Sequence, residues 1–277
     1  MQDLRQSSNW AKYLEFIGWK VEKINNVYVY LKKIPVLGYF IKIQRPGKIL
    51  KKDIEKLKQK FKPFQICIEP DSSNQVKLLK ELNFKLSKSP SLPTKTLQID
   101  LSRSEETLLK KFSQKTRYNI KLSQRKEIDI KNYRDVLLFT KFWRENFEKN
   151  RFPFLSQQKN IIALYNAFGK DANILLVKRN EKIIAGLFIL IYDKVAYYMY
   201  AASNDYGRKN FAPTLLTWNA ILMAKKNGCK IFDFDGIYDE RFPIKTWLGF
   251  TKFKKGFGGK EVLYPGNFVK NKFYFKI

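Results

Sequence analysis

The chain has 277 residues, of which 44% are hydrophobic and 16% aromatic; this content excludes a disordered chain and can bury one large core or two modest ones. Its 54 Lys and Arg outnumber its 25 Asp and Glu, and the formal net charge of +29 favours a polyanionic partner such as RNA, a nucleotide diphosphate or anionic lipid headgroups. A Lys-rich source genome would give the same charge without such a partner. Histidine is absent, so Ser-His and Cys-His nucleophilic sites and an imidazole base are excluded.

Neither the amino-terminal residues nor the apolar runs predict a targeting or spanning segment. Residues 1–10 have no apolar run after a basic segment, and the longest apolar stretch, residues 183–192, is about half of the roughly 20 residues that a spanning helix needs. We expect a soluble, cytoplasmic protein, and its charge leaves peripheral contact with an anionic membrane surface open. Cys67 and Cys229 are too few and too far apart for a disulfide framework or a recognisable metal site, so we expect no metal.

The first part of the chain has the pattern of a small α/β unit. Residues 7–16 place Trp10 and Tyr13 at helical spacing behind polar capping residues. Further helices are predicted at residues 49–60 and 75–82, and strands at residues 27–31, 36–43 and 64–69.

Residues 87–94, S-K-S-P-S-L-P-T, carry the strongest linker signal in the chain, because two prolines and three serines occur close together. We place the domain boundary there and expect one domain at residues 1–90 and a second at residues 91–277. The first would be the abbreviated one.

The second part predicts helices and an antiparallel meander. A strand at residues 96–101 precedes a helix that begins at Ser104, and three apolar runs joined by short turns form the meander. The other elements are helices at residues 115–126, 133–149, 156–168 and 214–226, and strands at residues 173–178, 183–191, 195–200 and 231–234. This order predicts an α/β layer fold in the manner of N-acyltransferases, with a mixed, largely antiparallel sheet flanked by helices.

A basic ridge is predicted on the helix around Asn119. Its cations would face outward while Phe112, Tyr118, Ile120 and Leu122 turn toward the core. Such a ridge suits a phosphate backbone, and a merely solvated helix face is an equally open interpretation. The ridge comprises Lys110, Lys111, Lys115, Arg117, Lys121, Arg125 and Lys126.

Arg151 and a pair of tyrosines are candidates for holding a ligand. Arg151 starts the loop R-F-P-F, where its planar guanidinium could bind phosphate or carboxylate, although it could equally cap the preceding helix. Tyr198 and Tyr200 should share one face of a strand because side chains alternate, and the small residues 201–203 leave space at its end. Packing in the core is the ordinary use of such tyrosines.

The segment at residues 208–213 argues against a coenzyme-A donor. A coenzyme-A acyltransferase would open its next helix with a glycine-rich turn whose N–H groups bind pyrophosphate. Here Phe211 occupies the glycine position, and Pro213 removes a further N–H.

The most informative stretch lies at residues 232–260. Asp233 and Asp235 bracket a residue of a strand and should point the same way, so they could orient a substrate amine or accept its proton, or serve only as structural groups. Lys254 follows Phe253 and precedes a glycine turn, a setting in which an ammonium beside backbone amides can stabilise an oxyanion. The alternative is an exposed Lys254 beside phenylalanines that merely pack.

In order along the chain, these motifs resemble the FemABX family of peptidyltransferases. The motifs are Q-S-S-N-W at residues 6–10, K-T-R-Y-N-I at 115–120, R-F-P-F at 151–154, Y-M-Y-A-A-S at 198–203, D-F-D-G-I at 233–237 and F-K-K-G-F-G-G at 253–259. The resemblance is concentrated between residues 96 and 266.

The resemblance implies tandem acetyltransferase-like (GNAT-like) domains. They would transfer an amino acid from aminoacyl-tRNA to an amine of a peptidoglycan precursor, the UDP-linked or lipid-linked muropeptide, without metal, coenzyme A or another cofactor. It assigns substrate binding to Arg151, Tyr198, Tyr200 and, more loosely, Lys12, and ester cleavage to Lys254 next to Phe253. The charge fits a tRNA donor on the ridge. An N-acyltransferase with an acyl-CoA or other acyl donor and a non-catalytic RNA-binding module remain the alternatives.

Overall fold

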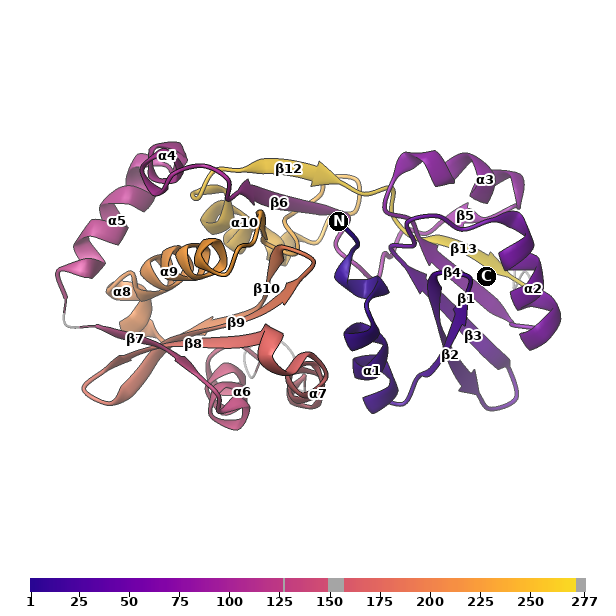
Figure 1. The fold of residues 1–277 in the computed structure, drawn as a ribbon, viewed down its shortest axis with the longest axis horizontal. Helices are drawn as coiled ribbons and strands as arrows, with labels where there is room; N and C mark the ends of the chain where they lie inside the picture. Colours follow the sequence, from indigo (N-terminus) through magenta and orange to yellow (C-terminus); the bar gives the residue numbers. More distant parts are fainter. Residues whose placement is uncertain (127, 149–156, 273–277) are drawn as a thin grey trace. The chain divides into compact units, whose positions relative to one another are not determined.

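The computed structural model describes residues 1–126, 128–148 and 157–272 (Figure 1). The chain divides into two compact units, each built around its own sheet. The first unit comprises residues 1–95, 239–244 and 263–277, and the second comprises residues 96–238 and 245–262. Among the described residues, no helix has the length and apolar character needed to cross a membrane.

The first unit contains a six-stranded sheet in the order β1-β2-β3-β4-β13-β5. Strands β3 and β4 are parallel, and the other pairings are antiparallel. Its elements are η1 (Leu4–Gln6), α1 (Ser8–Phe16), β1 (Lys20–Ile24), β2 (Val27–Ile34), β3 (Gly38–Gln44), α2 (Lys51–Phe61), β4 (Gln65–Glu69), η2 (Ser73–Gln75), α3 (Val76–Glu81), β5 (Lys85–Leu86) and β13 (Phe268–Asn271). The predicted helices and strands of this part are confirmed, whereas β1, β5 and β13 were not predicted.

Side chains on one face of this sheet form an apolar core with α2 and α3. Polar contacts add to the buried apolar side chains of α1. Gln6 accepts from the Tyr28 amide at 2.8 Å and donates to the Gln44 carbonyl at 2.7 Å, and Trp10 Nε1 donates to Gln44 Oε1 at 3.1 Å. Ser7 caps α1 by accepting from the Trp10 amide. The Q-S-S-N-W motif therefore anchors α1 to β2 and β3.

The predicted linker is fixed to the first unit. The buried carboxylate of Glu69 accepts from the Ser91 amide and hydroxyl and from the Leu92 amide at 2.7 to 2.9 Å. Thr94 donates to Asp239 at 2.6 Å, within the same unit. Strand β13, which lies near the end of the chain, pairs between β4 and β5, so the first unit is not continuous in sequence. The division at residues 90 and 91 as a domain boundary stays a prediction.

The second unit contains a seven-stranded sheet in the order β12-β6-β11-β10-β9-β8-β7. The pairings β7–β8, β8–β9, β9–β10 and β6–β11 are antiparallel, which confirms the predicted meander, and β10–β11 is parallel. Its strands are β6 (Lys95–Asp100), β7 (Asp129–Tyr133), β8 (Ala172–Arg179), β9 (Lys182–Tyr192), β10 (Val195–Ser203), β11 (Ile231–Asp233) and β12 (Lys260–Leu263).

Helices cover both faces of this second sheet (Figure 1). They are α4 (Glu105–Lys111), α5 (Gln114–Gln124), α6 (Val136–Trp143), a π-helix (Arg144–Glu148), α7 (Gln158–Phe168), α8 (Asp205–Lys209), α9 (Ala212–Lys226) and α10 (Leu248–Lys255), with short 3-10 turns at Gly169–Asp171 and Lys245–Trp247.

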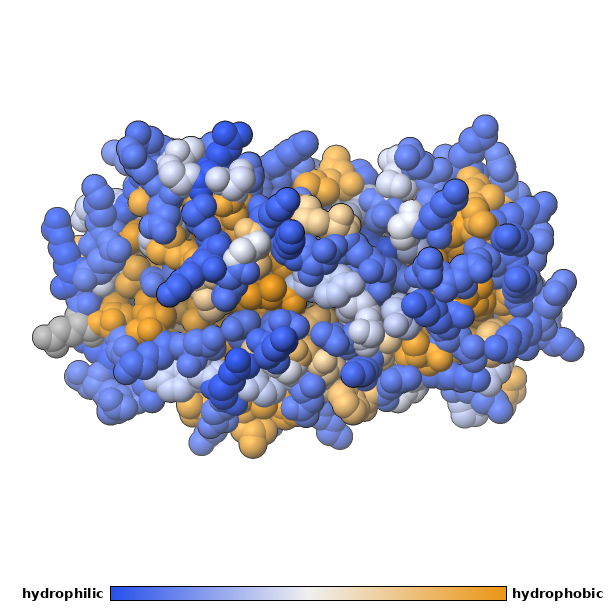
Figure 2. All heavy atoms as spheres, viewed as in Figure 1, coloured by the Kyte–Doolittle hydropathy of each residue, from blue (hydrophilic) through white to orange (hydrophobic). Residues whose placement is uncertain are grey.

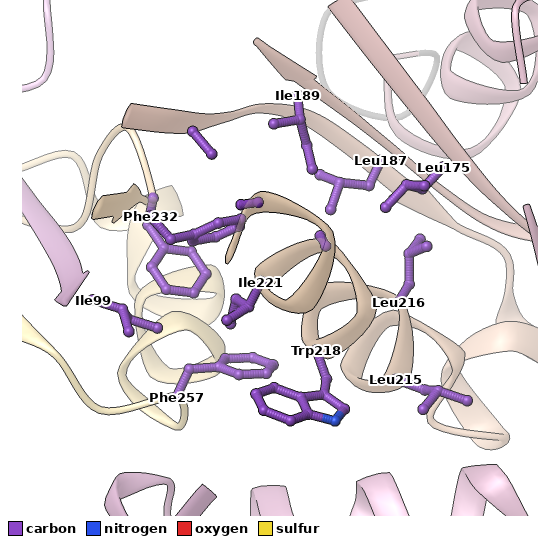
Figure 3. Close-up of a cluster of buried hydrophobic side chains, with 14 of the residues drawn as sticks. Ile99, Leu175, Leu187, Ile189, Leu215, Leu216, Trp218, Ile221, Phe232 and Phe257 are labelled. Carbon is purple, nitrogen blue, oxygen red and sulfur yellow. The ribbon is translucent and has the colours of Figure 1, made fainter. Parts of the chain in front are cut away.

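The core of the second unit forms around α9. Figure 3 shows Leu216 and Ile221 of α9 directed toward Leu187 and Phe232 of the sheet. Trp218 and Phe257 each lie edge-on to Phe112 at 5.3 Å between ring centroids. Hydrophilic side chains cover most of the visible surface outside (Figure 2). Phe112 and Ile120 are buried as predicted, but the expectation that Tyr118 faces the core is wrong, because its side chain is 62% exposed.

Candidate functional site

The candidate site lies where the parallel strands β10 and β11 stop pairing. Their register runs from Val195–Ile231 to Tyr197–Asp233 and ends there. Strand β10 continues to Ser203 beside β9 alone, while the chain turns out of β11. The carboxyl ends of neighbouring parallel strands that diverge are common ligand sites in α/β folds, because backbone groups and side chains are presented there without strand partners.

Asp233 holds the turn that follows β11. Its buried carboxylate accepts from Thr96 Oγ1 at 2.5 Å, from Gln98 Nε2 at 2.7 Å and from the Asp235 amide at 2.8 Å. The Gly236 amide donates to the same Thr96 hydroxyl at 3.2 Å. Burial, with a smaller contribution from the charge of Asp235, raises the pKa of Asp233. Because three protein groups donate hydrogen bonds to its carboxylate, Asp233 stabilises the conformation of the turn.

The expectation that Asp233 and Asp235 point the same way is not supported by the backbone. Strand β11 ends at Asp233, and Asp235 has φ +51°, in the left-handed region. Strand alternation therefore does not extend to Asp235. Gly236 follows with φ +133°, a value that glycine adopts readily, so the D-F-D-G sequence encodes a tight turn.

Lys254 lies under this turn, so the alternative interpretation, an exposed side chain, is wrong. Only 8% of its surface is exposed. Its Nζ donates to the carbonyls of Phe234 and Gly236, both at 2.8 Å, and lies 5.3 Å from the ring centroid of Tyr198 and 4.7 Å from that of Phe250. Burial lowers the pKa of Lys254 to about 8, although the charges of Asp235 and Asp233 act in the opposite direction.

The ammonium of Lys254 retains a donor for a ligand. A protonated lysine has three N–H donors, and the two carbonyls occupy two of them. Within the described part of the chain, no third acceptor lies within hydrogen-bonding distance. The arrangement can therefore direct one N–H and a positive charge at an oxygen that becomes negative during a reaction.

The glycines after Lys254 allow close packing of the chain. Gly258 has φ +67°, and a Cβ there would lie 2.7 Å from the Lys111 carbonyl oxygen. Gly259 has φ +100°, and its Cβ would lie 2.7 Å from the Gln98 carbonyl oxygen. Phe253 is partly buried and packs edge-on against Phe257 at 5.3 Å. The motif thus seats the end of α10 against α4 and β6.

Gly258→Ala should destabilise the second unit. The added methyl group would clash with a backbone oxygen, and alanine would have to adopt a left-handed conformation. We expect these two effects to cost about 1–3 kcal/mol. Chemical denaturation should show a lower free energy of unfolding. The matched control is Gly249→Ala on α10, where a Cβ meets nothing within 4 Å and helix propensity favours alanine. Equal stability of Gly258→Ala and the wild type would contradict the packing argument.

Tyr198 and Tyr200 lie on opposite faces of the sheet, so the expectation of a shared face is wrong. The register of β10 against β9 shifts between these residues, which places one extra residue, Met199, in β10. Tyr198 packs against Phe234 on the side of α9, and burial raises its pKa. Tyr200 lies edge-on to Trp143 of α6 at 5.5 Å. Of these two tyrosines, Tyr198 is the one whose ring contacts Lys254.

The other predicted site residues either lie away from Lys254 or fall outside the described residues. Arg151 belongs to residues 149–156, which are outside the described residues. Lys12 is exposed on α1, in the first unit. On α5 and its carboxyl end, Lys115, Lys121 and Arg125 are exposed. Arg117 instead donates to the carbonyls of Phe112 and Lys110, so it stabilises the end of α4.

Sequence reasoning missed Thr96, Gln98 and Phe250. Thr96 and Gln98 alternate on β6 and face Asp233 from more than 130 positions away in the sequence, so no local pattern marks them. Phe250 lies one helical turn before Lys254, and that i, i+4 spacing is a signal that could have identified it.

A pocket of about 580 Å³ in the first unit was also missed. Lys42 lines it, with its Nζ 4.3 Å from the ring centroid of Trp19, and burial lowers the pKa of Lys42. Asn267 lines it as well, and its buried Oδ1 has no hydrogen-bond partner within the described residues. An ammonium, an aromatic face and an acceptor suit an anionic ligand that carries N–H or O–H groups.

No group of three or more Cys, Asp or Glu side chains in the described ranges comes together in a way that could hold a metal ion. The two acceptors at Lys254 Nζ are main-chain carbonyls.

The fold and the carboxyl-terminal half match known proteins. A crystal structure of FemX superposes with a TM-score of 0.82 over 97% of this chain and 92% of that chain, at 17% identity. The C-terminal domain of a putative lysylphosphatidylglycerol synthetase from Agrobacterium fabrum superposes with a TM-score of 0.64 over 97% of this chain and 89% of that one, at 13% identity. The predicted α/β class, with largely antiparallel sheets flanked by helices, is confirmed, and FemX has the same fold.

Residues 177–276 match the FemAB family. The aminoacyltransferase FemA of Staphylococcus epidermidis is 34% identical over 89 residues, which is 32% of this chain and 21% of FemA. The matched segment thus spans about a fifth of that relative. The carboxyl-terminal part of the chain thus matches the family that its motifs resemble, and the fold of FemX extends over both units.

Proposed function

We propose that the chain is an aminoacyltransferase that moves an amino acid from aminoacyl-tRNA to an amine of a peptidoglycan precursor. The match of residues 177–276 to the FemAB family and the similarity to FemA support this activity. The observation that carries the proposal is the buried ammonium of Lys254, which is fixed by two carbonyls at 2.8 Å and has one donor left. The acceptor is a UDP-linked or lipid-linked muropeptide, and a tRNA donor places the reaction in the cytoplasm.

The proposed reaction is an aminolysis of an ester. The acceptor amine attacks the ester carbonyl carbon, and the carbonyl oxygen takes up negative charge as the tetrahedral intermediate forms. The third N–H of Lys254 donates to that oxygen. The bond from the carbon to the ribose oxygen then breaks, and the proton that the amine loses ends on the ribose hydroxyl. Because the ester is already activated, positioning of the two substrates supplies much of the remaining rate enhancement.

A coenzyme-A donor is disfavoured by the start of α9. Phe211 has φ +56° at the N-cap, and Ala212 and Pro213 open the helix. Pro213 has no N–H to offer a pyrophosphate, and the side chain of Phe211 replaces the glycine that would let a phosphate approach. A transfer assay with charged tRNA and either muropeptide, followed by product mass, tests the proposal directly. No product with either acceptor, together with acyl transfer from acyl-CoA, would overturn it.

Lys254→Ala should lose turnover while keeping tRNA binding. Removing one oxyanion donor costs about 10²- to 10³-fold in kcat, and the two carbonyls left without a donor also cost about 1–3 kcal/mol of stability. Single-turnover transfer, filter binding of tRNA and a denaturation curve separate these effects. Lys252→Ala is the control, because Lys252 lies on the same helix with an exposed side chain. Turnover of Lys254→Ala equal to that of the control would remove Lys254 from the mechanism.

The transfer rate should fall as pH rises through about 8. The protonated form of Lys254 predominates below its pKa of about 8 and the neutral amine above it, so an ammonium that stabilises an oxyanion is lost on the alkaline side. The acceptor amine gains reactivity in the same direction, and Lys254→Arg separates the two effects, because a guanidinium does not titrate there. The alkaline fall should be present in the wild type and absent in Lys254→Arg. A rate that rises through pH 8 in the wild type alone would instead identify Lys254 as a base.

Charge reversal on α5 should weaken the binding of the tRNA donor. We place the tRNA on the exposed ridge formed by Lys115, Lys121 and Arg125, and leave out Arg117 because it caps α4. The triple change to Glu should lower tRNA affinity and reduce the slope of log affinity against log salt by about 2 to 3. The control changes three exposed lysines of the first unit to Glu, namely Lys52, Lys56 and Lys77. Equal losses in both triple variants would show that net charge acts without a defined ridge.

A further inference from the structure

One end of the first unit exposes apolar side chains that its core does not use. Pro35, Val36 and Leu37 form the turn between β2 and β3. The side chain of Val36 is 106% exposed and that of Leu37 is 52% exposed. Val36 also has φ +66°, a conformation that is rare and costly for a β-branched residue. Within the unit, no burial of Val36 offsets that cost.

The carboxyl end of α1 lies at the same end of the unit. Lys32, near the end of β2, donates through Nζ to the Gly18 carbonyl at 2.8 Å, which ties the residues after α1 to this part of the sheet. Phe16, the last residue of α1, is 64% exposed. The carboxyl end of α1 and the β2–β3 turn thus lie at one end of the unit, and Phe16, Val36 and Leu37 are exposed apolar residues of these two segments. The ribbon shows α1 beside the β1–β2–β3 part of the sheet (Figure 1).

Lysines surround these apolar side chains. The carboxyl end of α2 is brought to this edge because the Phe64 amide donates to the carbonyl of Tyr39, whose partner on β2 is Lys33. The charged residues here are Lys20, Lys32, Lys33, Lys60 and Lys62 against Glu15 and Glu22, which is five positive charges against two. Lys20 and Lys60 pair with Glu22.

Lys33 and Lys62 are the exposed lysines with no ion pair at this edge within the described residues. We call Phe16, Lys33, Val36, Leu37 and Lys62 the docking edge. It consists of a narrow apolar tip with two lysines near it, both on the side of the sheet that α2 covers.

We propose that the docking edge binds an anionic lipid bilayer. Val36 and Leu37 enter the boundary between headgroups and acyl chains, and Lys33 and Lys62 contact lipid phosphates. A bilayer fits better than a folded protein partner, because the apolar tip consists of only two residues at a turn, while its charge complements anionic headgroups. The inference rests on the proposed function and refines it, since it assigns the lipid-linked muropeptide as the acceptor.

Vesicle binding tests the docking edge. The full chain is sedimented with vesicles of phosphatidylcholine alone or with about a third phosphatidylglycerol. We expect binding to the anionic vesicles only, weakened about tenfold or more by Val36→Asp/Leu37→Asp. The control is Leu137→Asp/Leu263→Asp, which adds the same charge at two other exposed leucines. Equal weakening in both double variants, or no binding by the wild type, would overturn the proposal.

Transfer assays separate this inference from the proposed function. Val36→Asp/Leu37→Asp should slow transfer to a lipid-linked muropeptide in anionic vesicles and leave transfer to the UDP-linked form in solution unchanged. If the variant slows neither reaction, the docking edge fails and the aminoacyltransferase function stands. If no transfer occurs with either acceptor while the variant still loses vesicle binding, the function fails and the docking edge stands.

Discussion

The candidate site depends on the pair of hydrogen bonds from Lys254 Nζ to the Phe234 and Gly236 carbonyls. They connect α10 to the turn after β11. The buried carbonyls receive the donor that they need, and the buried ammonium receives the acceptors that it needs. Burial lowers the pKa of Lys254 to about 8, so the charge survives at neutral pH in a site that largely excludes water. An ammonium held this way is oriented before a substrate arrives, which is the condition for electrostatic stabilisation of a transition state.

The surrounding fold fixes that geometry from two further directions. Thr96 on β6 bonds to both Asp233 and the Gly236 amide, so the strand positions the turn whose carbonyls receive the lysine. Gly258 allows the chain after α10 to approach α4, where the ring of Phe257 lies edge-on to Phe112. Segments more than 130 residues apart in sequence thus constrain one ammonium.

Periodicity could predict most of the helices and strands and the meander, because these are local properties of the sequence, and the motifs singled out Lys254 as a candidate. They could not predict the extra residue in β10, which separates Tyr198 from Tyr200, since a bulge leaves no signal in an alternating apolar run. The role of Asp233 was also hidden, because its donors lie on β6. Similarly, Glu69 fixes a segment whose composition reads as a linker. In each case the deciding contact is distant in sequence.

The composition and the site together limit the chemistry that this chain can perform. There is no histidine, and three protein donors already bond to Asp233, so these side chains supply no strong general base at the Lys254 ammonium. At the Lys254 ammonium the described site offers a fixed positive charge and one free donor, and the charge of Asp235 raises the pKa of this lysine. That is insufficient to activate a poor electrophile, yet it suits an ester that an amine can attack once both are held in place. Under the proposed function the substrate carries the activation, because an amino acid esterified to a ribose hydroxyl is already an activated donor.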